Sequence, residues 1–131
     1  MTKTVKVLLH AMLLASCSFA GMAAKAASYP SKPITFIVPF PPGAGVDIVT
    51  RLVTTKLSAA LSQPFVIANR SGAGGTVGAA EAARATPDGY TLLAAPSSIA
   101  VSQSLYKNLS FNLDKDFRAV GLMASVPFAP P

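Results

Sequence analysis

The residues best suited to bind a small ligand lie where a predicted strand ends. Phe40, Pro41, Pro42, Gly43, Ala44 and Gly45 follow the apolar run Ile34 to Val38. Glycines in this stretch allow successive backbone N–H groups to point toward one centre, and a helix that starts just after them adds its positive dipole end. The prolines stiffen the approach to the loop. The chemistry that this pattern favours is the binding of an anion.

Two further sets of polar side chains lie at predicted element boundaries. Asp47 stands at the start of the predicted helix, where a carboxylate most often caps backbone N–H groups and competes with an anionic ligand for them. We therefore expect capping by Asp47 rather than ligand contact. Ser97 and Ser98 follow Pro96 at the end of another predicted strand. Their hydroxyl and N–H groups could bind a carboxylate or a bridging water, or they could cap a helix. The sequence leaves these two possibilities open.

The chain has few side chains that could catalyse a reaction or bind a metal ion. The chain has one His, His10, and one Cys, Cys17, and both lie near its N-terminus. The rest of the chain therefore cannot supply a Ser-His-Asp triad, a Cys-His pair or an ordinary zinc site. The carboxylates that could bind a hard cation are scattered: Asp47, Glu81, Asp88, Asp114 and Asp116. We expect no enzyme activity and no metal.

The glycine-rich stretch Gly72 to Gly78 does not fit a dinucleotide-binding pattern. In G-x-G-x-x-G the third glycine would fall at Val77, and no acidic residue follows at the distance that a ribose requires. We expect a tight turn that lets the next helix pack closely. No cofactor is expected.

The first 26 residues have the three-part pattern of a secretory signal. Lys3 and Lys6 precede an apolar run that extends to about Met22, and Ala24 to Ala26 form an A-x-A cleavage site. An alternative is the stretch Leu14 to Cys17, which resembles a bacterial lipobox and would place a lipid on Cys17. Either interpretation takes the mature chain out of the cytoplasm, and we expect a periplasmic location.

Without residues 1–26, the net charge falls from +6 to +3, because eight Lys and Arg residues and five Asp and Glu residues remain. Much of the basic character belongs to the signal, so a nucleic-acid partner is not expected.

Alternation of strand and helix patterns positions these loops. We expect strands over residues 34–40, 65–69, 90–95 and 121–128, and helices over 46–61 and 76–85. In the first helix Ile48 and Leu52 belong to the predicted apolar face, and Thr54 belongs to the opposite side. This order favours an α/β fold with a parallel sheet.

Three stretches, in order, resemble one known family: "YPSKPITFIVPFPPGAGVDIVTRL", "ANRSGAGGTVGAAEAARATPDGYTLLAAPSS" and "LYKNLSFNLDKDFRAVGLMASVP". They are similar to the Bug family, the extracytoplasmic solute-binding receptors of tripartite tricarboxylate transporters. The resemblance implies a two-lobed, type II periplasmic-binding-protein fold that closes on a small carboxylate ligand. It also implies partnership with the membrane subunits of the transporter.

Carried over residue by residue, the resemblance assigns ligand contact to the loop after the first strand and to a later strand-end loop. Ala44 replaces a glycine that is more usual in the first loop, which should matter little if its φ is negative. The matching residues are Phe40, Pro41, Pro42, Gly43, Ala44, Gly45 and Asp47 in the first loop and Ser97 and Ser98 in the later one.

The resemblance implies that residues 27–131 are the N-terminal part of the first lobe, with the second lobe absent, so that the chain would be a truncated receptor. A lobe alone leaves its loops facing water, and we expect it not to bind a carboxylate measurably by itself. The alternative is a secreted fragment or pseudogene product without independent activity.

The signal segment yields a direct expectation for the exported product. Mass spectrometry should find an N-terminus at or near Ala27 if the A-x-A site is cleaved. A diacylated N-terminal Cys17 would contradict this and establish the lipoprotein.

Overall fold

The computed structural model describes residues 28–125. The predicted signal, residues 1–26, and the alternative lipid site at Cys17 lie outside this range. No helix within it is long and apolar enough to span a membrane. The elements, in chain order, are β1 (Ile34–Val38), α2 (Gly45–Leu61), β2 (Phe65–Asn69), the short 3-10 helix η2 (Ala73–Gly75), α3 (Thr76–Ala83), β3 (Thr91–Leu93), α4 (Ser97–Leu105) and α5 (Leu113–Asp116).

The three strands form one parallel sheet in the order β2-β1-β3. β1 is central, and four of its five residues are buried, as the continuous apolar run predicts for a strand covered on both faces. Its last residue, Val38, pairs with Asn69 at the end of β2. The predicted α/β fold with a parallel sheet is confirmed. The carboxyl ends of the strands meet at one edge, where α2 and α4 begin.

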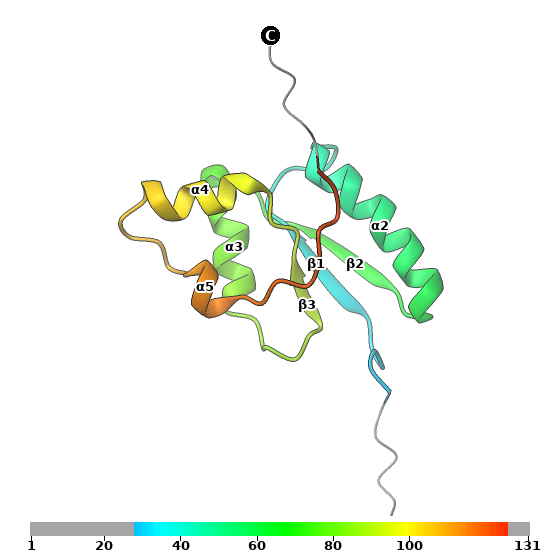
Figure 1. The fold of residues 1–131 in the computed structure, drawn as a ribbon. Coiled ribbons are helices and arrows are strands. Elements are labelled where there is room, and N and C mark those ends of the chain that lie inside the picture. The colour runs from blue at the N-terminus through cyan, green and yellow to red at the C-terminus, as the bar shows by residue number, and fades with distance from the viewer. Residues whose placement is uncertain (1–27, 126–131) are drawn as a thin grey trace, which may run out of the picture.

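Helices cover both faces of the sheet (Figure 1): α2 lies along one face, and α3, α4 and α5 lie on the other side. On the α2 side, Phe36 and Val38 form a buried cluster with Ala94, against which Val46 packs. The cluster on the other side is built from Ala79, Ala80, Ile99 and Phe111. Each face of β1 therefore has a helix layer of its own.

The face that α2 turns to the sheet is more polar than the sequence predicts. Thr50 and Thr54 are buried, whereas Ile48 and Leu52 are 51% and 67% exposed. The buried hydroxyls are satisfied within the helix, because Thr50 Oγ1 donates to Val46 O (2.7 Å) and Thr54 Oγ1 donates to Arg51 O (3.2 Å). The assignment of Ile48 and Leu52 to the covered face, and of Thr54 to the opposite side, was wrong.

One other expectation differs from the structure, and one helix was not expected. Residues 97–105, to which no helix or strand was assigned from the sequence, form helix α4. Residues 121–125 form no strand, and the rest of the expected fourth strand, 126–128, lies outside the described range. Instead, Met123 of this segment packs against the cluster of Phe36, Val38 and Ala94. The predicted strand was therefore wrong over 121–125.

The turn at Gly72 to Gly78 brings α3 close to the end of β1, as the sequence predicts. A Cβ at Gly78 would lie 2.8 Å from the carbonyl oxygen of Arg70 and 2.9 Å from the Cβ of Pro39. Both neighbours are at the backbone or fixed to it, so there is no flexible side-chain end that could move aside.

This contact reverses the usual effect of alanine in a helix. Gly→Ala ordinarily stabilises a helix by up to about 1 kcal/mol, but at position 78 the clash should lower the urea midpoint of the chain. Gly45→Ala is the matched control, because nothing lies within 4 Å of a Cβ there. A Gly78→Ala variant as stable as the wild type would contradict this packing.

Candidate functional site

The loop between β1 and α2 has a fixed backbone shape. Gly43 has a φ of +85°, a region that residues with a side chain rarely adopt, so glycine is favoured there. Ala44 has a φ of −65° and a ψ of 155° and acts as the N-cap of α2. Because its φ is negative, alanine fits at position 44 without strain.

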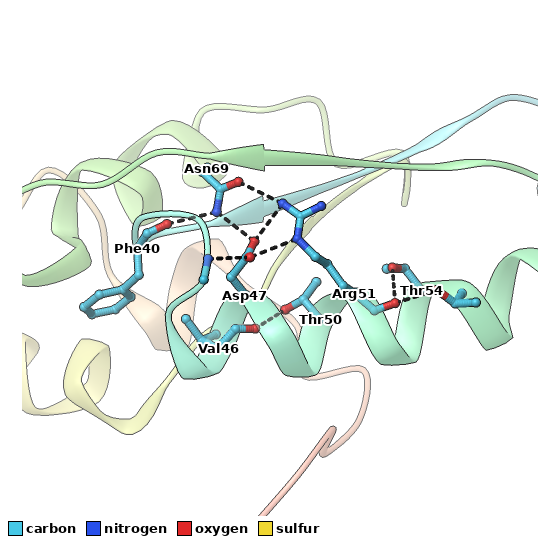
Figure 2. Close-up of polar contacts among 9 residues, drawn as sticks. Phe40, Val46, Asp47, Thr50, Arg51, Thr54 and Asn69 are labelled. Atoms are coloured by element: carbon cyan, nitrogen blue, oxygen red, sulfur yellow. Dashed lines mark hydrogen bonds and ion pairs between the residues drawn. The ribbon is translucent and has the colours of Figure 1, made fainter.

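Asp47 is the centre of the polar contacts around this loop (Figure 2). The residue is 1% exposed, although it carries a carboxylate in the first turn of a helix. One oxygen, Oδ2, accepts from the backbone N–H of Gly43 and from Arg51 Nε, both at 2.9 Å. The other, Oδ1, accepts from Arg51 Nη2 at 3.0 Å and from Asn69 Nδ2 at 2.9 Å. Four donors thus satisfy the buried carboxylate.

Asn69 connects this carboxylate to the start of the loop. Its Nδ2 also donates to the carbonyl oxygen of Phe40 at 3.0 Å (Figure 2). Asn69 is the last residue of β2, and its backbone stands opposite Val38 in the sheet. The end of β2 is therefore joined through one amide to both Phe40 and Asp47.

The contacts hold Asp47 in its charged form. The hydrogen bonds from Arg51, from the Gly43 N–H and from Asn69 keep the pKa of its carboxyl well below the usual range, against the opposing effect of burial. In turn, the hydrogen bond to Asp47 raises the pKa of Arg51. The bidentate pair places one negative and one positive charge at the start of α2, so the pair adds no net charge there.

The backbone donors that remain open differ from those that the sequence suggests. The N–H of Gly43 is bound to Asp47, and the N–H of Ala44 donates to Pro41 O at 3.2 Å. The first N–H of α2 with a helical acceptor is that of Ile48. Among residues 28–125, the N–H groups of Gly45, Val46 and Asp47 have no acceptor. The positive end of α2 is thus open from Gly45 onward.

The role of Asp47 also differs from the capping that the sequence predicts. Its carboxylate does bind a backbone N–H, but that of Gly43 in the loop, two positions before the helix. The N-cap of α2 is Ala44, which has no side-chain cap. The contact thus lies outside the helix, at the left-handed residue of the loop.

Phe40 lies between the first loop and the start of α4. A Cβ at Gly75 would be 3.2 Å from Phe40 Cε2 and 2.7 Å from Ile99 Cδ1. The ring of Phe40 and the side chain of Ile99 both lie close to Gly75. Phe40 is half-buried. Pro41, Pro42 and Gly45 are exposed.

Ser97 and Ser98 are the first two residues of α4, and both are exposed. Pro96 is the N-cap of this helix, and no side chain caps it. The capping alternative is therefore not what the structure shows. α4 and the loop at Phe40 follow neighbouring strands, β3 and β1, at the same edge of the sheet.

The sequence reasoning missed Arg51 and Asn69. The i, i+4 spacing of Asp47 and Arg51 is a signal for an ion pair on one helix face. Asn69 could have been found only from the strand pairing, since it is distant in sequence from Phe40. Arg70, which follows Asn69, forms an exposed ion pair with Glu81 at 2.9 Å.

Residues 49–129 match the family model described as tripartite tricarboxylate transporter family receptor. The chain belongs to this family. Among curated relatives, BugT of Bordetella pertussis is 42% identical over 112 residues, which are 82% of this chain and 34% of BugT. The chain spans about a third of the length of the curated relatives that it matches.

Solved structures agree with this assignment. A protein described as a periplasmic transporter is 53% identical, with a TM-score of 0.62, over 65% of this chain and 29% of that one. MatC from Rhodopseudomonas palustris, solved with bound malate, is 38% identical with a TM-score of 0.62, over 68% of this chain and 31% of MatC. The described part of the chain thus has the fold of part of a periplasmic-binding-protein lobe. The family is one of receptors rather than enzymes.

The buried carboxylate should make the stability of the chain sensitive to acid. A pKa that is depressed in the folded state contributes stability above the unfolded-state value of about 3.9, and this contribution is lost as the pH falls through the lower folded-state value. Asp47→Asn should therefore be destabilising at neutral pH, and the gap to the wild type in urea midpoint should narrow below about pH 4. Asp88, whose pKa is also lowered, is present in both proteins and cancels. A gap that does not change with pH would contradict the assignment.

Proposed function

We propose that the chain forms the carboxylate-binding part of an extracytoplasmic receptor that captures a small carboxylate for uptake by a tripartite tricarboxylate transporter. The observation that carries the proposal is the set of open N–H groups at the start of α2, beginning at Gly45. They stand at the carboxyl edge of a parallel sheet, where ligands of α/β folds bind. The malate bound by MatC, which has a similar fold, is a ligand of the same chemical class.

The electrostatics of the loop support an anionic ligand. A carboxylate beside a helix N-terminus would normally repel a second carboxylate, but Arg51 neutralises Asp47 through two hydrogen bonds. The helix dipole then acts on the ligand without an opposing net charge.

The proposed ligand contacts extend across the edge of the sheet. The first loop, from Phe40 to Gly45, would supply backbone donors and the wall formed by Phe40. Ser97 and Ser98 would supply hydroxyl and N–H groups from the start of α4, where no side-chain cap uses them. In this proposal Asp47 shapes the loop and does not contact the ligand. The receptor would act in the periplasm, with the membrane subunits of the transporter as partners and with no cofactor or catalytic residue.

Gly45→Pro separates the donor from the shape of the loop. Proline is favoured at the first position of a helix, and the extended ψ of Ala44 (155°) suits a residue that precedes proline. The substitution should therefore keep the fold but remove the N–H. A donor to a charged acceptor is worth roughly 1.5–3 kcal/mol, so affinity for a carboxylate should fall about tenfold or more.

The measurement requires a complete receptor, which a chimera provides. Residues 28–125 would replace the corresponding segment of MatC, and malate binding would be followed by calorimetry. Gly45→Ala is the matched control, because it keeps the N–H and its Cβ meets nothing within 4 Å. The proposal fails if Gly45→Pro binds malate as tightly as Gly45→Ala, or if the unsubstituted chimera folds but does not bind.

A further inference from the structure

We propose that Asp47, Arg51 and Asn69 are positioning residues, which together form a latch that fixes the first loop before any ligand arrives. The first loop runs from Phe40 to Gly45, and the three side chains come from α2 and from the end of β2. Only the consequence for ligand affinity rests on the proposed function. The fixing of the loop is a property of this chain alone.

The latch holds the loop at both of its ends. Asn69 donates to the carbonyl oxygen of Phe40, where the loop leaves the sheet. Asp47 accepts from the N–H of Gly43, where the loop turns into the helix. Since Asn69 also donates to Asp47, the two anchor points are joined by one direct hydrogen bond. A loop that contains Gly43 would otherwise be free to leave its left-handed conformation.

Arg51 keeps the acceptor charged and correctly oriented. Its Nε and Nη2 bind the two oxygens of Asp47 in a fork, which fixes the plane of the carboxylate. Oδ2 is thereby directed at Gly43 and Oδ1 at Asn69. Arg51 acts through Asp47 and needs no contact with a ligand.

The latch has a functional consequence because it decides which donors a ligand finds. The N–H of Gly43 is bound to Asp47 and that of Ala44 to Pro41 O, so the open donors begin at Gly45. A loop already fixed in this shape loses less conformational freedom on binding, which raises affinity. A purely electrostatic role for Asp47 would have the opposite sign, because removal of a nearby negative charge should tighten the binding of an anion.

Amide hydrogen exchange of the 131-residue chain tests the latch without a ligand. Asp47→Asn and Asn69→Ala should each speed exchange at Gly43 about tenfold or more. The amides of Thr35 and Ala94, which are bonded between strands, should change much less. Glu81→Gln is the matched control, since it alters an acid in a different ion pair and should leave Gly43 unchanged.

Two results would overturn the proposal. One is a Gly43 amide that exchanges in the wild type as fast as an unprotected amide. The other is an acceleration at Gly43 in the variants that merely equals the acceleration at Thr35 and Ala94, because this is what a general loss of stability produces.

Malate binding by the MatC chimera adds a second readout. The double substitution Asp47→Asn with Arg51→Gln leaves the local net charge unchanged. If the three residues act as a latch, malate should bind about tenfold more weakly to the double variant. If Asp47 acts only through its charge, the affinity for malate should not change. Unchanged affinity in the double variant would overturn the functional part of the proposal. If the unsubstituted chimera does not bind malate, the proposed function fails, and exchange at Gly43 alone decides the latch.

Discussion

The geometry of the candidate site depends on one buried carboxylate. Asp47 is almost fully covered, and burial of a charge is costly unless the group is paired and hydrogen-bonded. Arg51, Asn69 and the N–H of Gly43 meet that requirement, and each of them fixes a different part of the structure in doing so. The need to satisfy this one charge therefore ties a loop, a helix and a strand end together.

The same constraint accounts for the unusual face of α2. A helix that directs Asp47 inward also directs Thr50 inward, three residues later, and Thr54 follows at the next turn. The hydroxyls of both threonines bond to backbone oxygens of the same helix, so they can be buried without external partners. Ile48 and Leu52 then face outward. The inward position of Asp47 therefore explains why the face of α2 that covers the sheet is polar.

Elements with strong local signals could be predicted from the sequence, and those that depend on distant contacts could not. The continuous apolar run of β1 and the glycine-rich turn before α3 were predicted with their packing roles, because burial on two faces and close approach follow from residue type. The helix at residues 97–105 has weak periodicity and is stabilised by the packing of Ile99. The expected strand over 121–125 has suitable residues, but it does not pair with the sheet.

The location of the candidate site could be predicted from the sequence, but its hydrogen-bond network could not. The loop from Phe40 to Gly45 follows from the strand, the glycines and the helix start. Which of its N–H groups remain open depends on Asp47 and Asn69, and the contact with Asn69 exists only because β2 lies beside β1. The signal that identifies the ligand loop thus lies in the local sequence. Which of its N–H groups are free to bind a ligand depends on tertiary contacts.

A crystal structure of the MatC chimera with malate would show directly which donors the ligand uses. We expect a malate carboxylate oxygen within about 3.2 Å of the backbone nitrogen of Gly45 or Val46, with the bond from Gly43 to Asp47 intact. A malate carboxylate that displaces Asp47 from Gly43, or that lies away from the start of α2, would contradict it.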